Sequence, residues 1–346
     1  MNVKTERYAK QILFAEMDEA KQQQLLNSRV LLCGCGALGS VLADLLVRAG
    51  VGFLRIVDRD FVELSNLQRQ VLYNEEDVAN HIPKAIAASS RLKKINSDVT
   101  IEPVVADINH TNILQYAEEV DLILDGTDNF EIRFLINDVS LETNIPWIYA
   151  GVIGSHGQTM TIFPHETGCL RCLIDTPPEA GTTETCDTAG VLAPAVNVVS
   201  SLEAIDAIKI LSGQKEKVAQ TLTVLDVWEG SLRQMKTENL RDKGDCAACH
   251  HGERLWLTGK RGSTSTILCG RNAVQITPPT KTKINFDELA EKLKSSGKVE
   301  QNAYLLRLTL SNPDYEITLF HDGRAIVKGT EEMSIARSVY SRYIGG

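Results

Sequence analysis

The sequence predicts an α/β fold: a Rossmann-like, doubly wound and mostly parallel sheet with an antiparallel extension, followed by a small C-terminal α+β domain. Three observations favour this prediction. Apolar, strand-like runs alternate with helical patterns over residues 29–152, with short loops between them. A glycine loop, Gly34-x-Gly36-x-x-Gly39, follows the first of these runs. Beyond Gly252 the sequence is rich in short strand-like runs.

The first part of the chain places strands and helices in alternation. Residues 1–28 are expected to form two short helices. The runs that follow are apolar enough for buried strands and cover 30–33, 54–57, 99–104, 121–125 and 145–149. A helix from Ser40 to Ala49 carries apolar residues at helical spacing and stops at Gly50, a residue typical of helix C-caps. Such alternation with short loops indicates a mostly parallel sheet.

From about residue 150 the pattern changes to shorter and more varied elements. We expect antiparallel strands over 151–172, a loop over 177–195 and a long amphipathic helix over 195–213. A further strand is expected over 221–228 and a cysteine turn over 244–253. The C-terminal domain is expected to contain strands and a final helix, at 304–310, 315–320, 324–328 and 331–343. We therefore assign residues 1–250 to the first domain and 251–346 to the second.

Composition and charge exclude several classes of protein. The 346 residues are 43% hydrophobic and 23% charged, which suits two globular domains. A net charge of −9 without a Lys/Arg-rich block gives little support to nucleic-acid binding. The N-terminus lacks a signal-peptide core, and no run reaches the roughly 18 apolar residues of a membrane span. We expect a cytoplasmic protein whose eight cysteines are metal ligands, nucleophiles or core residues rather than disulfides.

The glycine loop indicates a nucleotide without saying which one. Asp58 lies about 20 residues beyond the loop, where dinucleotide-binding folds place the acid that holds a ribose. Glycines let the backbone approach phosphates, and the N-terminus of the following helix attracts them. NAD(P) and ATP use the same features, so an NAD(P)-dependent oxidoreductase stays an alternative at this point, as does a tight turn without a ligand.

The charged residues beyond Asp58 favour ATP. Arg69 and Lys84 lie in a polar segment where they would surround a triphosphate with cations, as nucleotidyl transfer requires. Asp125 and Asp128 follow a later strand, at the edge of the sheet where ligands bind. A carboxylate beside a triphosphate is a natural Mg²⁺ ligand. Asp128 has a second interpretation as a helix N-cap.

The cysteines divide by spacing into different kinds of residue. Two C-x-x-C pairs have the ligand number of a closed, structural zinc site, with a redox-active pair as the alternative: Cys169, Cys172, Cys246 and Cys249. Cys33, Cys35 and Cys269 are expected to be small core or turn residues. Cys186 lies in the polar loop before the long helix and has no cysteine partner.

Taken together, these motifs identify a family. The segments GCGALG, DRDFVELSNLQRQ, PKA, DGTDN, CLRC and TCDTAGV occur in order between Arg7 and Cys249, and in this the chain resembles the ThiF/MoeB/HesA family, the bacterial relatives of ubiquitin-activating enzymes. The resemblance implies a homodimer that adenylates the C-terminal glycine of a ubiquitin-like sulfur carrier protein with release of pyrophosphate. A cysteine desulfurase or sulfurtransferase is implied as a further partner.

The resemblance also implies roles for individual residues. Asp58 would hold the ATP ribose, with Asp60 nearby, and the loop Gly34, Gly36, Ala37 and Gly39 would lie against the nucleotide. Asn66, Arg69 and Lys84 would contact phosphates, and Asp128 would bind Mg²⁺. Lys10 stands where the family usually has an arginine that reaches the partner subunit's ATP, and Ala37 where many relatives have glycine. Lysine keeps the charge but loses the bidentate fork.

Three questions stay open on the sequence alone. The carrier is either ThiS-like, for thiamine thiazole synthesis, or MoaD-like, for molybdopterin synthesis. Cys186 is either a nucleophile that takes the carrier as a thioester or persulfide, or a loop cysteine without an essential role. The terminal Gly345-Gly346 is either a tail able to enter an active site or a flexible helix end.

Overall fold

The computed structural model describes residues 3–128, 130–177, 189–237, 240–261, 265–268, 272–277, 284–311 and 314–344. The chain divides into two units, residues 1–261 and 262–346. The division falls after the second cysteine turn, Cys246–Cys249, because the segment that follows this turn is hydrogen-bonded to the first unit. Oδ2 of Asp138 accepts from the backbone N–H of Trp256 at 2.9 Å.

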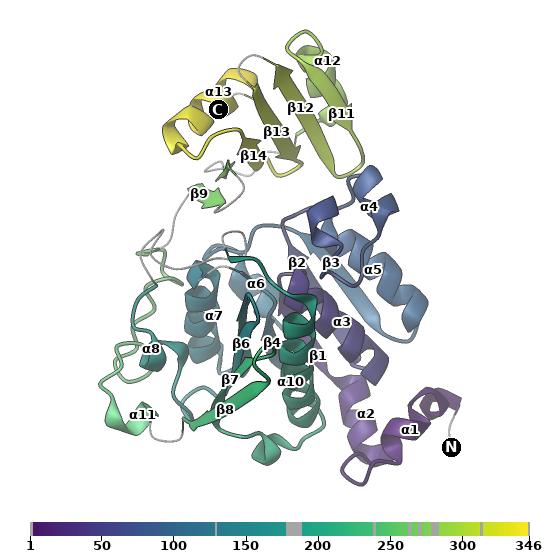
Figure 1. Cartoon of the computed structure of the whole chain (residues 1–346), viewed down its shortest axis with the longest axis vertical. Helices are drawn as coiled ribbons and strands as arrows, with labels where there is room; N and C mark the ends of the chain where they lie inside the picture. The colour runs from purple at the N-terminus through teal and green to yellow at the C-terminus, as the bar shows by residue number, and fades with distance from the viewer. Residues whose placement is uncertain are drawn as a thin grey trace. The chain divides into compact units, whose positions relative to one another are not determined.

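An eight-stranded sheet with the order β3-β2-β1-β4-β5-β6-β7-β8 organises the first unit (Figure 1). The first five strands run parallel: β1 (Arg29–Cys33), β2 (Phe53–Asp58), β3 (Thr100–Val105), β4 (Leu122–Asp125) and β5 (Trp147–Ile153). The other three are antiparallel: β6 (His156–Ile162), β7 (Thr221–Asp226) and β8 (Ser231–Lys236). The predicted doubly wound sheet with an antiparallel extension is confirmed, and its strand order reverses between β1 and β4.

Helices cover both faces of this sheet (Figure 1). The bounds of the helices are η1 (Val3–Tyr8), α1 (Ala9–Ile12), α2 (Glu19–Asn27), α3 (Ala37–Ala49), η2 (Leu64–Asn66), α4 (Glu75–Ala79), α5 (Lys84–Ile95), α6 (Ile113–Ala117), α7 (Phe130–Thr143), α8 (Leu170–Leu173), α10 (Ala193–Leu211), η3 (Lys215–Lys217) and α11 (Leu240–Lys243). Alternate residues of β1 point to different cores: Val30 and Leu32 pack with α2, α3, α5 and α10, whereas Leu31 and Cys33 pack with α6 and α7.

The helix α3 extends further than the sequence pattern predicts. It begins at Ala37 rather than at Ser40, because Gly36 already provides the carbonyl that accepts from the N–H of Ser40 at 3.0 Å. Its end agrees with the prediction: Gly50 has a φ of 93°, and its N–H donates to the carbonyl of Leu46.

The second unit is an antiparallel sheet with two helices. The strand order is β11-β12-β13-β14-β10-β9, and α12 and α13 pack on one face around Leu308, Ile317 and Val327. The bounds are β9 (Ser265–Leu268), β10 (Ala273–Ile276), α12 (Phe286–Leu293), β11 (Lys298–Gln301), β12 (Leu305–Ser311), β13 (Asp314–Phe320), β14 (Ala325–Lys328) and α13 (Met333–Tyr343). The expected α+β character is confirmed, and the turn between β13 and β14 contains Gly323 with a φ of 85°.

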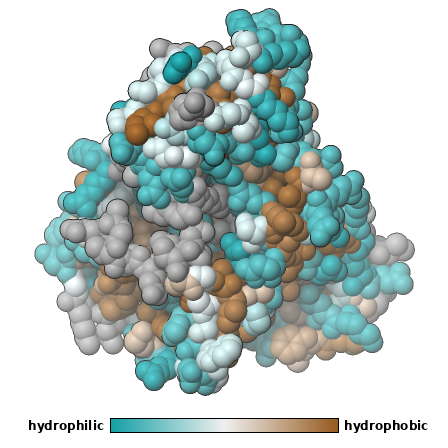
Figure 2. Space-filling model, turned by 45° about the horizontal axis from the view of Figure 1, so that its top comes forward, coloured by the Kyte–Doolittle hydropathy of each residue, from teal (hydrophilic) through white to brown (hydrophobic). Residues whose placement is uncertain are grey.

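The surface in Figure 2 is largely hydrophilic, with apolar side chains gathered in smaller brown patches. Among the helices of the described residues, none combines the length and the apolar character needed to cross a membrane.

Candidate functional site

The glycine loop joins β1 to α3 and packs backbone against backbone. Gly34 has a φ of 85° and donates its N–H to the carbonyl of Val57 at 2.8 Å. A Cβ atom at Gly39 would lie 2.1 Å from the carbonyl oxygen of Gly34, and one at Gly126 would lie 2.4 Å from the same oxygen. The close packing therefore requires three glycines, one of which comes from the loop after β4. Gly36 and Ala37 open α3, so this packing presents the helix N-terminus at the C-terminal edge of the sheet.

Asp58, at the end of β2, binds the backbone of the glycine loop. Its carboxylate accepts from the backbone N–H of Cys35 at 2.6 Å and from that of Asp60 at 2.7 Å. The hydroxyl of Tyr73 donates to the carbonyl of Cys35 at 2.6 Å, so both ends of the Cys35 residue are fixed. Burial raises the pKa of Asp58, which nearby Lys84 opposes. The sequence pattern predicts only a ribose contact for Asp58, and the structure adds this second role. Each carboxylate oxygen keeps a further lone pair, so its contact with the loop does not prevent it from accepting another hydrogen bond.

Lys84 lies beside the two aspartates at the start of α5. Its Nζ donates to Oδ2 of Asp60 at 3.2 Å, and its backbone N–H donates to the carbonyl of Asp60 at 2.9 Å. The side chain is buried, with only 4% exposed. The fold therefore brings Asp58, Asp60 and Lys84 together.

Asn66 and Arg69 lie on and just after the 3-10 helix η2. Asn66 is buried, and its Oδ1 accepts from the N–H of Glu63 at 3.2 Å. The half-buried Arg69 donates from NH1 to the carbonyl of Ser65 at 2.9 Å. Both side chains are thus oriented by their own turn. Lys10 lies on α1 and is exposed in the single chain.

The loop between β4 and α7, which carries Asp128, is held by hydrogen bonds among its own residues. Asp125 is fully buried, and its Oδ1 accepts from the backbone and hydroxyl of Thr127 at 2.9 and 2.7 Å. Oδ2 lies 2.9 Å from Nε of Arg133. Asp128 is exposed and precedes the start of α7 at Phe130 by two residues. Its side chain is therefore presented to solvent at the edge of the sheet.

Arg59 is a charged residue of this edge that the sequence analysis did not select. Its NH1 lies 2.9 Å from Oδ1 of Asp107, and its Nε lies 3.8 Å from Oδ1 of Asp60. Burial alone would lower the pKa of the guanidinium, but the carboxylates of Asp107, Asp60 and Asp128 together raise it. The signal available in the sequence was a cation between two aspartates directly after an apolar strand.

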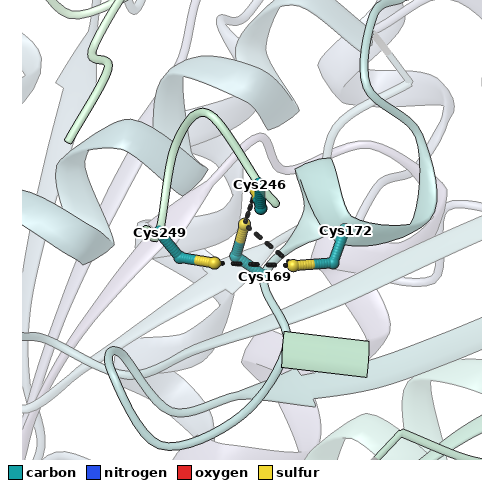
Figure 3. Close-up of side chains that lie close together, drawn as sticks. All are labelled: Cys169, Cys172, Cys246 and Cys249. Carbon is teal, nitrogen blue, oxygen red and sulfur yellow. Dashed lines mark hydrogen bonds between the residues drawn. The ribbon is translucent and has the colours of Figure 1, made fainter. Parts of the chain in front are cut away.

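The four cysteines of the two C-x-x-C pairs form one cluster (Figure 3). The Sγ atom of Cys169 lies 3.8 Å from that of Cys172 and 3.7 Å from that of Cys246, and Cys172 lies 3.5 Å from Cys249. Zinc bound at about 2.3 Å to four thiolates in a tetrahedron gives sulfur–sulfur distances of about 3.8 Å. The donor set and its size therefore fit zinc.

Two successive residues of α7, Asn137 and Asp138, accept hydrogen bonds from the segments that carry the cysteines. Oδ1 of Asn137 accepts from the N–H of Leu170 at 2.8 Å, in the first cysteine turn. Asp138 binds the segment after the second turn, and the ring centroids of Phe134 and Trp256 lie 4.5 Å apart. The helix that carries Arg133 is thus shared by the cysteine cluster and by the Asp125 loop.

Several predicted residues lie elsewhere or cannot be placed. Cys33 and Cys35 are buried, as expected for core residues, and burial raises the pKa of the Cys35 thiol to about 12. Cys186, Cys269 and the terminal Gly345-Gly346 lie outside the described residues.

Fold and site together define a protein of the doubly wound, nucleotide-binding class that carries a separate four-cysteine centre. A family model described as the ThiF family matches residues 8–248, and the chain belongs to this family. The sulfur carrier protein ThiS adenylyltransferase of Bacillus subtilis is 40% identical over 99% of this chain and 100% of its own length. The Escherichia coli protein of the same name is 37% identical over 70% of this chain and 94% of its own.

A solved structure agrees at the level of the fold. Escherichia coli MccB with ATP matches with a TM-score of 0.60 at 24% identity, covering 67% of this chain and 72% of that one. The family model and the relatives confirm the family resemblance inferred from the motifs.

Proposed function

We propose that the protein is an ATP-dependent adenylyltransferase that activates the C-terminal glycine carboxylate of a ubiquitin-like sulfur carrier. The observation that carries the proposal is the similarity to a ThiS adenylyltransferase along the whole chain, including the second unit. Because that relative spans residues of both units, we favour a ThiS-like carrier over a MoaD-like one. A requirement for ATP supports a cytoplasmic location.

The nucleotide site assigns a role to each clustered side chain. Asp58 would accept from the ribose hydroxyls, and the loop Gly34–Gly39 with the N-terminus of α3 would face the phosphates. Lys84, Arg69 and Asn66 would contact phosphate oxygens, with Asp60 orienting Lys84 through the 3.2 Å contact. Asp128, exposed at the end of the β4–α7 loop, is the carboxylate available to Mg²⁺. When bound, Mg²⁺ would neutralise phosphate charge.

The chemistry needs alignment and charge neutralisation rather than a general base. The carrier carboxylate is ionised at neutral pH and attacks the α-phosphorus; the bond to the bridging oxygen breaks and pyrophosphate leaves. Lys84 and Arg69 would stabilise the charge that moves onto the leaving group. Arg133 would contribute indirectly, because it holds the loop that carries Asp128.

The cysteine cluster would hold a structural zinc ion. All four ligands are thiols, so no position is left open for a substrate, which is the pattern of closed sites. Hydrogen bonds among the four thiols lower the pKa of Cys246 and Cys249 and raise that of Cys169, because the thiols share protons; a bound metal would need all four as thiolates, so its binding would release protons.

The carrier needs a docking surface, and we propose the β7–β8 hairpin. β8 is an edge strand whose six residues are all exposed. Trp228, Leu232 and Met235 are 77%, 55% and 53% exposed, an unusual concentration of large apolar side chains.

A second apolar pair, Leu13 and Phe14, follows Lys10 and would belong to a homodimer contact that brings Lys10 to the partner's ATP. Cys186 and a sulfur-donating enzyme would act after adenylation.

Exchange of pyrophosphate into ATP tests the proposal. The protein is incubated with Mg-ATP, labelled pyrophosphate and either a ThiS-like or a MoaD-like carrier with a Gly-Gly terminus. We expect exchange that depends on the ThiS-like carrier and disappears when its last glycine is removed. Exchange with the MoaD-like carrier alone would overturn the carrier assignment. Absence of exchange with both carriers, together with tight NAD(H) binding, would overturn the proposed activity.

A further inference from the structure

Gln70 is a buried glutamine close to the glycine loop to which the proposed reaction gives no role. It follows Arg69 in the segment after η2, and only 3% of its surface is exposed. Its Oε1 is enclosed by the fold and accepts no hydrogen bond from any described residue. A buried acceptor without a donor destabilises a protein, and an apolar side chain of similar shape would avoid this loss. The packing of the fold alone therefore does not explain a glutamine here.

The segment that carries Gln70 is fixed at both ends. The backbone N–H of Gln70 donates to the carbonyl of Asn66 at 3.0 Å, and its carbonyl accepts from the N–H of Tyr73 at 3.3 Å. The hydroxyl of Tyr73 then donates to the carbonyl of Cys35, in the glycine loop, at 2.6 Å. The position of the Gln70 amide is thus set relative to the glycine loop.

The amide nitrogen borders a space beside Gly36. A Cβ atom added at Gly36 would lie 3.8 Å from Nε2 of Gln70 and 4.0 Å from the carbonyl oxygen of Gly126, which are ordinary van der Waals distances. Cβ atoms at Gly39 and Gly126 would instead lie 2.1 and 2.4 Å from the carbonyl oxygen of Gly34. Close packing therefore requires glycine at Gly39 and Gly126, whereas the missing side chain at Gly36 leaves room for a ligand.

This space lies at the N-terminus of α3. Gly36 directly precedes Ala37, the first of the 13 residues of the helix, and among the described residues no side chain caps it. The first N–H groups of a helix have no helical partners, and together with the helix dipole they attract anions. An amide donor beside them would add a directed hydrogen bond to the same anion.

We propose that Gln70 donates a hydrogen bond from Nε2 to a phosphate oxygen of ATP bound at the N-terminus of α3. The inference rests on the proposed function, because it takes ATP as the anion. Arg69 and Lys84 would bring positive charge to the phosphates, whereas Gln70 brings a directed donor without charge. The unsatisfied Oε1 is then the loss of stability that accompanies a side chain placed for a ligand.

Replacing Gln70 with methionine separates a ligand contact from a structural role. Binding of Mg-ATP and of inorganic triphosphate to the full-length protein is measured by calorimetry, and stability by urea unfolding without ligand. We expect Gln70→Met to bind both ligands about tenfold or more weakly, the range of a hydrogen bond to a charged group. Its urea midpoint should equal or exceed that of the wild type, because the unsatisfied acceptor is gone.

A second variant, Gln70→Glu, keeps the shape of the side chain and replaces the donor with an acceptor. Measured at pH 8, it should bind Mg-ATP and triphosphate more weakly than Gln70→Met, because a carboxylate repels phosphate. This variant decides the question if Gln70→Met does not fold.

The matched control is Gln22→Met. Gln22 is also buried, but its Nε2 donates to the carbonyl of Ala49 at 3.0 Å and its Oε1 accepts from Nε2 of Gln11 at 2.7 Å. Ala49 is the last residue of α3, so this glutamine lies at the opposite end of the helix from Gly36. We expect the reverse pattern: a lower urea midpoint and wild-type affinity for both ligands.

Three outcomes would overturn the inference. The first is wild-type affinity for both ligands in Gln70→Met, including the case in which only the KM for the carrier rises. The second is weaker binding of ATP with unchanged binding of triphosphate, which would place the contact away from the phosphates. The third is wild-type affinity in Gln70→Glu. Wild-type protein that binds no ATP would instead contradict the proposed function.

Discussion

Nε of Arg133 lies 2.9 Å from Oδ2 of Asp125, and both side chains are almost completely buried. NH2 of Arg133 also donates to the carbonyl of Thr127 at 2.7 Å, so one side chain binds both ends of the turn before Asp128. Burial raises the pKa of Asp125, and Arg133 is the largest influence that opposes the rise. The pair therefore favours the charged form of a buried carboxylate and fixes the loop that presents Asp128.

Replacing Arg133 with methionine should destabilise the protein strongly. The change leaves the Asp125 carboxylate buried without its cation, and breaking a buried pair in this way costs about 3–5 kcal/mol. Urea unfolding of the first unit measures the loss. Arg48→Met is the control, because Arg48 and Asp44 form an exposed i,i+4 pair at 2.9 Å that contributes about 0.3–0.5 kcal/mol. Equal effects of the two substitutions would contradict the account.

Removal of zinc from the cysteine cluster should increase hydrogen exchange in the β4–α7 loop that follows Asp125. Asn137 and Asp138 of α7 bind the two cysteine turns, and Arg133 of the same helix binds Asp125. We expect Cys172→Ser to lose bound metal and to increase hydrogen exchange over residues 125–138. Glu216→Gln, an exposed change on η3 outside the cluster, should keep the metal and the exchange pattern. Metal loss with unchanged exchange over this segment would disprove the coupling.

Lys84→Met should abolish most of the adenylation rate. The substitution removes a charged donor that would lie next to the phosphates, and loss of one such donor reduces rates by about 10²–10³-fold. It also removes a cation that lowers the pKa of Asp58. Carrier-dependent pyrophosphate exchange is the measurement. Lys93→Met, exposed in the last turn of the same helix, should exchange at the wild-type rate. An active Lys84→Met variant would remove Lys84 from the site.

Much of this arrangement is predictable from the chain itself, because it depends on local patterns. Apolar runs locate β1, β2 and β4, and the spacing of glycines locates the turn into α3. The C-x-x-C spacing predicts the cysteine cluster without any view of the fold. These signals all lie within a few residues of the element they define.

The remainder depends on contacts between distant segments. The bonds of Asp58 to Cys35 and of Asn137 to Leu170 join residues 23 and 33 positions apart, and no spacing rule anticipates them. The ion pair of Arg59 with Asp107 exists only because β3 lies beside β2 in the sheet. In the second unit, the four-residue strands β9 to β11 are too short to show a clear alternation, and they form as members of the six-stranded sheet.

Carrier docking at the β7–β8 hairpin predicts a selective defect. Trp228→Ser removes the most exposed large apolar side chain of the hairpin and leaves the nucleotide site intact. We expect the KM for the carrier in pyrophosphate exchange to rise about tenfold or more, as for an aromatic anchor of an interface, with ATP binding unchanged. Leu114→Ser, exposed on α6, is the control and should leave the KM unchanged. An unchanged KM for Trp228→Ser would place the carrier elsewhere.

Glu203→Gln should change how stability depends on pH. Glu203 is fully buried on α10, and burial and Asp125 raise its pKa well above 4.5, with Arg133 opposing. The folded protein thus holds this proton more tightly than the unfolded chain. Its contribution to stability is complete below pH 4.5 and is lost as the pH rises toward the folded-state pKa. Glutamine does not titrate, so Glu203→Gln should raise the Tm relative to the wild type more at alkaline than at acidic pH. Thermal unfolding across that range measures this, with the exposed Glu216→Gln as control. An equal Tm shift at every pH would show that Glu203 titrates alike in both states.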